Sequence, residues 1–229
     1  MKNIAIIPAR SGSKGLKDKN IKKLNGVPLL AYSIKAAKES NLFDEIMVST
    51  DSLKYAEIAR EYGATVPFLR SSKNSEDKSS SWDVVKEVLY KYLDRGIKFD
   101  SVCLLQPTSP LRRSDDIICG YQEILNNNVD SVTSVCKMDH SPLWTTTLDD
   151  TKSLKSLRKK IVDLPRQSLE TYYRINGAIY IRKINYYGNV IELLDNSETA
   201  YIMDKKYSVD IDTIEDFEYA SFLMNQKEM

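Results

Sequence analysis

The loop after the first apolar run combines cations with glycine and serine. It reads Pro-Ala-Arg-Ser-Gly-Ser-Lys-Gly-Leu-Lys-Asp-Lys-Asn over residues 8–20. Gly12 and Gly15 allow backbone N–H groups to approach oxygen atoms closely, and Arg10, Lys14 and Lys19 neutralise negative charge. The loop is neither a Walker loop nor a Gly-x-Gly-x-x-Gly dinucleotide site. This composition predicts a loop that binds a triphosphate, and the alternative is a solvated turn with surface lysines.

A second candidate is the carboxylate pair Asp210 and Asp212. Residues two apart on an extended chain point the same way, and adjacent carboxylates repel each other unless a cation lies between them. Mg²⁺ takes oxygen ligands and bridges phosphates, so the pair predicts a magnesium cofactor. Alternatively, Asp212 caps a helix that begins at Thr213, with Glu215 completing a capping box.

Two further segments could bind a polar ligand. Gln106 ends an expected strand and could contact hydroxyl or amide groups, although Gln-Pro-Thr-Ser-Pro is also a sequence typical of a tight turn. Arg166, within Pro-Arg-Gln, and Arg174 could hold a carboxylate in forked geometry, although surface arginines are common.

Composition excludes several other functions. The 33 cationic and 32 acidic side chains give a net charge of +1, which provides no electrostatic field for nucleic acid. The apolar runs are far shorter than the ~20 residues of a membrane helix, and no signal-peptide pattern is present. One histidine and no Cys-x-x-Cys motif exclude a common zinc site. Three widely spaced cysteines indicate reduced thiols, so we expect a cytoplasmic protein that binds neither nucleic acid nor membrane.

Apolar strand-like runs alternate with amphipathic helix-like runs along the chain. Strands are expected at 3–8, 45–50, 65–69, 101–105, 130–136, 176–181 and 199–203, and helices at 28–39, 52–62, 81–94, from 114, and at 213–223. This rhythm predicts an α/β fold with three layers, in which helices cover both faces of a mostly parallel sheet. We expect one domain over 1–229, with the candidate loops at the carboxyl edge of the sheet.

The alternation stops between about Met138 and Tyr173. This stretch is polar, contains Pro142 and Pro165, and includes the basic run Lys155–Lys160. A structureless loop of that length is unusual in a compact domain, so we expect an arm that packs against something, such as a second subunit.

Several motifs, in order, resemble those of the acylneuraminate cytidylyltransferase family, which comprises CMP-sialic acid synthetases and their bacterial CMP-nonulosonate synthetase relatives. The motifs are Ile-Pro-Ala-Arg-Ser-Gly-Ser-Lys-Gly, Leu-Gln-Pro-Thr-Ser-Pro-Leu-Arg, Pro-Arg-Gln, Asn-Gly-Ala-Ile-Tyr and Asp-Ile-Asp-Thr. The resemblance covers nearly the whole chain. It implies a nucleotide-diphospho-sugar transferase fold and transfer of CMP from CTP to the anomeric hydroxyl of a nonulosonic acid, with release of pyrophosphate. It also implies a homodimer in which the partner's arm helps to close the sugar pocket.

The resemblance implies a role for each matching residue. The nucleotide would be held by Arg10, Ser13, Lys14, Lys19, Asn20, Arg70, Ser80 and Ser81. The acidic sugar would be held by Gln106, Arg166, Arg174 and Asn176, with Arg166 at the carboxylate. Asp210 and Asp212 would hold Mg²⁺ and, with Arg10 and Lys19, form the catalytic set. Ser71 stands where relatives often carry proline after the arginine, so the local loop can differ.

Two alternatives remain at this stage. Transferases for the eight-carbon sugar Kdo tend to carry Ser-x-Arg-Leu-Pro-x-Lys in the first loop, whereas this chain has Ser-Lys-Gly-Leu-Lys at 13–17. A catalytically inactive nucleotide-binding relative would be expected to lose metal ligands first, and both aspartates are present.

Overall fold

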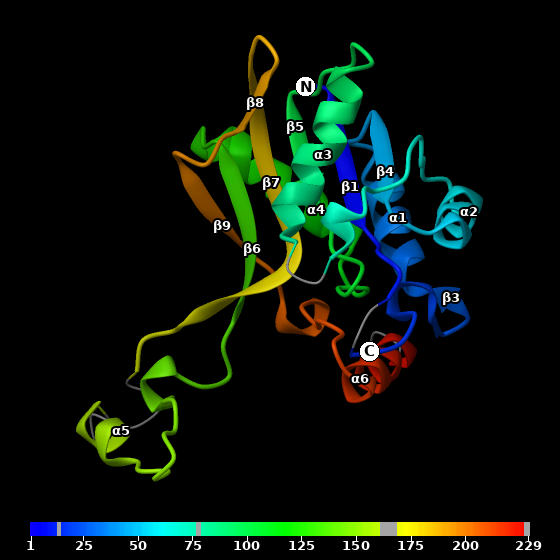
Figure 1. Ribbon diagram of the computed structural model, residues 1–229. Coiled ribbons are helices and arrows are strands. Elements are labelled where there is room, and N and C mark those ends of the chain that lie inside the picture. Colours follow the sequence, from blue (N-terminus) through cyan, green and yellow to red (C-terminus); the bar gives the residue numbers. More distant parts are fainter. Residues whose placement is uncertain (13–14, 77–78, 161–168, 227–229) are drawn as a thin grey trace.

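The central sheet has seven strands in the order β4-β1-β5-β7-β6-β9, with β8 paired to β7 (Figure 1). The computed structural model describes residues 1–12, 15–76, 79–160 and 169–226. The strands are β1 (Asn3–Pro8), β4 (Glu45–Ser49), β5 (Ser101–Leu104), β6 (Ser131–Lys137), β7 (Tyr173–Tyr187), β8 (Val190–Leu193) and β9 (Glu198–Ile202). β7 is antiparallel to β5, β6 and β8, and the remaining pairs are parallel. All these strands except β7 therefore run in one direction, which confirms the predicted mostly parallel sheet.

Helices cover both faces of this sheet. Successive strand residues point to opposite faces, so β1 contributes to two separate cores. Ala5 and Ile7 pack on the side of α1 (Leu29–Ser40), α2 (Leu53–Glu61) and α4 (Ser114–Asn127). Ile4 and Ile6 pack on the other side, with the apolar face of α3 (Ser81–Leu93). The three-layer prediction is thus confirmed.

A third, smaller core lies beyond the sheet edge that carries the candidate loops. Leu24 and Leu29 pack there against Ile211 and Ala220, the latter in α6 (Ile214–Asn225). Leu24 belongs to a small hairpin of β2 (Lys23–Leu24) and β3 (Val27–Pro28). This packing brings the segment before α6 against the loop that follows β1.

The expected strand at 65–69 is the main error in the predicted elements. Thr65 makes only an isolated bridge to Met47. Pro67 has no N–H to continue a ladder, so the segment cannot extend the sheet as predicted. The β2–β3 hairpin and β8 were not predicted.

The described part of the stretch between β6 and β7 projects from the body of the molecule (Figure 1). The Met138 N–H donates to the Tyr172 carbonyl at 2.9 Å, where the two sides of the projection meet. Beyond this point lie a 3-10 turn at Pro142–Trp144 and the short helix α5 (Lys155–Lys160). The basic run is therefore helical and lies away from the sheet, while the role of the arm in dimerisation stays a prediction.

Among the described residues, no helix combines the length and apolarity needed to cross a membrane. All three cysteines are free, and Cys103 and Cys136 are buried.

Candidate active site

A cavity of about 720 Å³ opens at the carboxyl edge of the sheet. β1 and β5 are neighbouring parallel strands, so the loops that follow them meet at this edge. The lining residues are Pro8, Arg10, Gly15, Lys19, Asn20, Arg70, Asn74, Glu76, Ser79, Ser81, Val84, Gln106, Pro107, Thr108, Asp210 and Asp212. The structure thus brings Arg10, Lys19, Asn20, Arg70, Ser81, Gln106, Asp210 and Asp212, all predicted site residues, into one cavity.

The loop after β1 is held by side-chain hydrogen bonds to its backbone. The Asp51 carboxylate accepts from the Ser11 N–H at 2.8 Å and from the Ser11 hydroxyl at 2.9 Å. The buried Asn20 amide donates to the Arg10 carbonyl at 3.0 Å. These contacts fix the backbone from which Arg10 and Lys19 extend into the cavity.

Arg70 supplies a buried cation to the lining of the same cavity as Arg10. Its Nε donates to the Ser49 hydroxyl at 3.1 Å, and an NH2 group donates to the Ser49 carbonyl at 2.5 Å. Burial lowers the pKa of the guanidinium to about 10, and nearby Arg10 acts in the same direction, against the carboxylates of Asp51 and Glu87. Arg70 remains charged at neutral pH, so the cavity presents a fixed positive charge to an anionic ligand.

Asp212 and Lys19 form an ion pair across the cavity mouth. Lys19 Nζ lies 2.9 Å from Asp212 Oδ1 and donates to the Ile211 carbonyl at 2.7 Å. The Asp212 side chain is 74% exposed. α6 is instead capped by Thr213 in a capping box with Asp216. The alternative that Asp212 caps this helix is therefore wrong, and its carboxylate is left to face the cavity.

Asp210 is the deeper of the two carboxylates. Among the residues that the structure describes, its buried Oδ1 has no hydrogen-bond partner. Burial raises the pKa of Asp210 and the Asp212 charge raises it further, against a Thr108 hydrogen bond and the charges of Lys19 and Arg174. Burial and the Asp212 charge outweigh these cations, so the ionised form of Asp210 is disfavoured.

The residues present fit a magnesium ion. An unsatisfied carboxylate oxygen beside a second carboxylate is an arrangement that a divalent, oxygen-seeking cation stabilises. Within the described part of the chain, no cluster of three or more acidic, histidine or cysteine side chains offers a fuller ligand set. Two carboxylates suffice for Mg²⁺, which commonly keeps several waters and takes further oxygens from substrate phosphates.

The backbone of Gln106 is held just after β5 by a hydrogen bond from Arg112. The buried Arg112 guanidinium donates to the Gln106 carbonyl at 3.3 Å and to the Ala178 carbonyl at 2.8 Å. Gly177 has a φ of +77°, and a Cβ there would lie 2.8 Å from Gln106 Oε1 and 3.8 Å from Asp210 Oδ2. A glycine at 177 therefore lets Gln106 and Asp210 approach the same stretch of β7.

Three predicted residues lie beside the cavity rather than on its wall. The Asn176 amide is buried and donates to the Ser208 hydroxyl at 2.9 Å, while its carbonyl accepts from the Ser134 hydroxyl at 2.6 Å. Ser80 caps α3 by accepting from the Asp83 N–H at 3.1 Å. Arg174 is exposed and its guanidinium donates to the Ser208 carbonyl at 3.4 Å. Direct ligand contacts by these residues stay predictions.

Ser13, Lys14 and Arg166 lie outside the described residues, so their roles also stay predictions. Sequence reasoning missed Asp51, Asn74, Glu87 and Thr108. Asp51 follows β4 closely, so its place at the carboxyl edge was an available signal. Glu87 carried no such signal, because it lies in mid-helix and touches the site only through a distant turn.

Comparison with known proteins decides the family. A family model described as cytidylyltransferase matches residues 4–229. This chain belongs to the cytidylyltransferase family. The family resemblance drawn from the sequence motifs is thereby confirmed.

Relatives of this cytidylyltransferase family member include enzymes for three kinds of acidic sugar. The chain is 40% identical to an N-acylneuraminate cytidylyltransferase of Escherichia coli O18:K1:H7, over 99% of this chain and 53% of that protein. It is 41% identical to a CMP-N,N'-diacetyllegionaminic acid synthase of Legionella pneumophila, over 79% of this chain and 78% of that protein. It is 30% identical to a pseudaminic acid cytidylyltransferase of Campylobacter jejuni, over 97% of this chain and 96% of that protein.

The chain therefore spans about half the length of the N-acylneuraminate cytidylyltransferases that it matches.

A solved structure of a CMP:2-keto-3-deoxy-manno-octonic acid synthetase complexed with CTP superposes with a TM-score of 0.70 at 16% identity, over 98% of both chains. At that identity the likeness shows the fold alone.

Proposed function

We propose that this protein transfers CMP from CTP to the anomeric hydroxyl of a nonulosonic acid of the sialic, legionaminic or pseudaminic type. The observation that carries the proposal is one cavity with Arg10, Lys19 and Arg70 facing the carboxylates of Asp210 and Asp212. The printed names of the relatives, which cover these acids, support the substrate class. We further propose that residues 1–229 act as one cytidylyltransferase domain.

The proposed reaction is a displacement at the α-phosphorus of CTP. The anomeric hydroxyl oxygen forms a bond to that phosphorus, and the bond from the α-phosphorus to the oxygen that bridges it to the β-phosphate breaks. Pyrophosphate leaves with that oxygen, and the hydroxyl proton passes to solvent water. Such transfers depend mainly on positioning and on neutralising the phosphate charge. Arg10, Lys19 and Arg70 supply that neutralisation, with Lys14 as a further candidate. Ser13 would donate a hydrogen bond to a phosphate oxygen, and Asn20 holds the Arg10 carbonyl.

Asp210 and Asp212 would hold Mg²⁺. When bound, the ion would neutralise phosphate oxygens at the carboxylate side of the cavity. Because Lys19 contacts Asp212 through its side chain, it would keep that carboxylate oriented before the substrates arrive.

The acidic sugar would bind beside Gln106 and β7. Arg166 would hold its carboxylate, with Arg174 nearby, and Asn176 would position Gly177 through its buried hydrogen bonds. We further propose a homodimer in which the arm at 138–173 of one subunit helps to close the sugar pocket of its partner.

A specific observation bears on each alternative. The structural neighbour that acts on the eight-carbon sugar is only 16% identical and shows the fold, whereas the relatives at 30–41% identity are named for nonulosonic acids. An inactive relative has no evident need for a buried Asp210 Oδ1 that, among the described residues, has no hydrogen-bond partner.

The test measures pyrophosphate release from CTP, in the presence of Mg²⁺, with each of a panel of acids: sialic, legionaminic and pseudaminic acids and Kdo. We expect release with at least one of the three nonulosonic acids. A clear preference for Kdo would overturn the substrate class, and CTP binding without release for any sugar would support an inactive module.

A further inference from the structure

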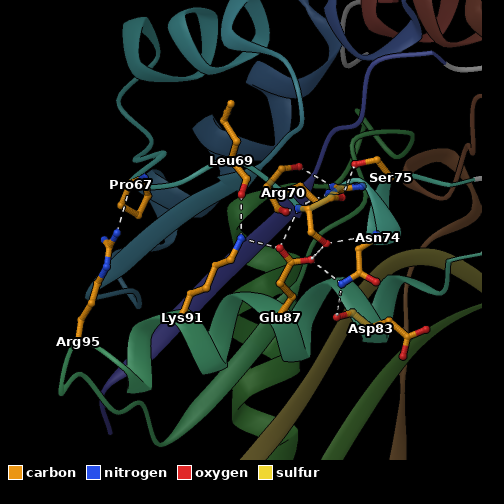
Figure 2. A network of polar contacts seen from close by, with 11 residues as sticks. Pro67, Leu69, Arg70, Asn74, Ser75, Asp83, Glu87, Lys91 and Arg95 are labelled. Carbon is orange, nitrogen blue, oxygen red and sulfur yellow. Dashed lines mark hydrogen bonds and ion pairs between the residues drawn. The ribbon is translucent and has the colours of Figure 1, made fainter.

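Glu87 lies on α3 outside the cavity, at the centre of the polar network in Figure 2. Its side chain is 13% exposed. Oε1 accepts from the Ser71 N–H at 2.8 Å and from Lys91 Nζ at 2.6 Å. Oε2 accepts from the Ser71 hydroxyl at 2.8 Å and from the Asn74 amide at 2.5 Å. Each carboxylate oxygen therefore accepts two hydrogen bonds, and three of the four come from the turn that follows Arg70.

That turn leads directly to two cations of the cavity. Arg70 is the residue before Ser71, and its N–H donates to the Thr50 carbonyl at 2.8 Å. The Ser71 carbonyl accepts from the Ser75 hydroxyl at 2.8 Å, and the Ser75 carbonyl accepts from the Arg10 guanidinium at 3.2 Å. Glu87 is thus linked to Arg10 by three hydrogen bonds through two residues, Ser71 and Ser75, and to Arg70 through its chain neighbour Ser71.

Proline could not replace Ser71 without loss of these contacts. Proline would fix φ by its ring but would offer neither an N–H nor a hydroxyl. Glu87 uses both of those donors of Ser71. The same arrangement recurs on the neighbouring loop, where Asp51 accepts from the N–H and the hydroxyl of Ser11.

We propose that Glu87 is a positioning residue for the nucleotide: it fixes the 71–75 turn and thereby the guanidinium groups of Arg70 and Arg10. This inference rests on the proposed function, because it assumes that these guanidinium groups bind the CTP phosphates. Glu87 itself does not line the cavity. Its effect on substrate therefore passes through the turn and through the attraction between its charge and Arg70.

Charge on Glu87 matters to this role. Only an ionised carboxylate accepts at both oxygens without donating. Burial alone would raise the pKa of Glu87, but the hydrogen bonds from Lys91, Ser71 and Asn74 outweigh it and lower the pKa to about 2. Glu87→Gln would keep one acceptor oxygen and direct an NH₂ group at the donors of Ser71 and Asn74.

The decisive experiment compares Glu87→Ala and Glu87→Gln with the wild-type chain. For each we would measure KM for CTP and for the sugar by pyrophosphate release, and CTP affinity by calorimetry. We expect Glu87→Ala to raise KM and Kd for CTP roughly tenfold, the scale of one lost charge-assisted contact, and Glu87→Gln to raise them less. KM for the sugar should be unchanged.

The matched control is Glu45→Ala. Glu45 is another half-buried carboxylate, which accepts from the Tyr92 hydroxyl at 2.9 Å and contacts Thr65, away from the cavity. We expect a loss of thermal stability with unchanged KM for CTP. A purely structural Glu87 would behave in the same way, with a lower melting temperature and no change in CTP affinity, and that result would overturn the proposal.

Ser71→Ala keeps the experiment decisive if Glu87→Ala does not fold. It removes only the hydroxyl contact, so we expect a rise of about two- to threefold in KM for CTP. An unchanged value in both Ser71→Ala and Glu87→Gln would contradict the role of the turn. Failure of the proposed function is separable, because it would show as a wild-type chain that binds CTP without releasing pyrophosphate. The calorimetric titrations would then still measure the effect of Glu87 on the affinity for CTP.

Discussion

At the scale of single residues, Asp210 and Asp212 differ in burial and in partners although they are two positions apart. Asp210 has a buried oxygen without a partner among the described residues, and Asp212 is largely exposed and paired with Lys19. Thr213 and Asp216 cap α6, so removing the Asp212 charge leaves the helix start intact. The main consequence of neutralising Asp212 should therefore be electrostatic.

We expect Asp212→Asn to lower turnover by about 10²–10³, the usual scale for removal of one electrostatic stabiliser. Thr213→Ala is the matched control, because it removes the adjacent cap and should cost about 1 kcal/mol of stability with near-normal turnover. Pyrophosphate release and thermal denaturation of both variants measure the two effects. Near-normal turnover of Asp212→Asn would contradict its place in the metal site.

Gly177 offers a second test at this scale. Gly177→Ala would place a Cβ 2.8 Å from Gln106 Oε1, so the Gln106 amide must rotate away. We expect about a tenfold rise in KM for the sugar, corresponding to one lost hydrogen bond, and about 1–2 kcal/mol of lost stability from the left-handed backbone.

Gly188→Ala separates these two effects. Gly188 also has a positive φ, of +61°, but a Cβ there would have nothing within 4 Å. It should show a similar loss of stability without a change in KM for the sugar. An equal change in KM for both variants would argue that Gly177 acts only through stability.

At the scale of elements, the contact of α3 with the 71–75 turn should make stability depend on pH. The pKa of Glu87 falls from its ordinary value of 4.5 to about 2 in the folded protein, because its hydrogen bonds outweigh its burial. The resulting stabilisation is fully present above about pH 4.5 and is lost as the pH falls toward 2. A fall in pKa from 4.5 to about 2 corresponds to at most about 3 kcal/mol of folding free energy.

Chemical denaturation at pH 7, 4.5 and 3 measures this contribution. The unfolding free energy of the wild-type chain should exceed that of Glu87→Gln at pH 7, and the difference should shrink as the pH falls. A difference that stays constant over this range would show that the carboxylate charge of Glu87 contributes nothing.

At the scale of the whole molecule, Arg166 belongs in sequence to the stretch between β6 and β7, outside the described residues. We expect Arg166→Ala to raise KM for the sugar far more than KM for CTP, because its guanidinium would bind the sugar carboxylate. Steady-state kinetics with each substrate varied in turn measure this. Equal effects on both constants would argue against carboxylate binding by Arg166.

Mixing two impaired variants, at a sugar concentration well below KM of Arg166→Ala, tests whether the arm acts on the partner subunit. If Arg166 acts in trans, a heterodimer of Arg166→Ala with Asp212→Asn contains one intact site and one doubly altered site. Equal mixing with subunit exchange should then restore about one quarter of wild-type activity. No recovery, in a mixture shown to form heterodimers, would place Arg166 in the site of its own subunit.

The sequence by itself determined the alternation of strands and helices, the cationic loop after β1 and the carboxylate pair before α6. These features depend on apolar periodicity and on residues close together in the chain, so local patterns suffice to predict them. Local patterns also mislead: the strand expected at 65–69 contains Pro67, and only one bridge forms there.

Only the tertiary structure decided which polar side chains of each motif line the cavity. Ser81 lines the cavity while Ser80 caps α3, and Asn176 is buried while Gly177 touches Gln106. A polar group binds whichever partner packing brings nearest, so its sequence position alone does not fix its role. Glu87 contacts the 71–75 turn at Ser71 and Asn74, which lie 16 and 13 positions earlier in the chain. Such a contact exists only once α3 has packed against the sheet.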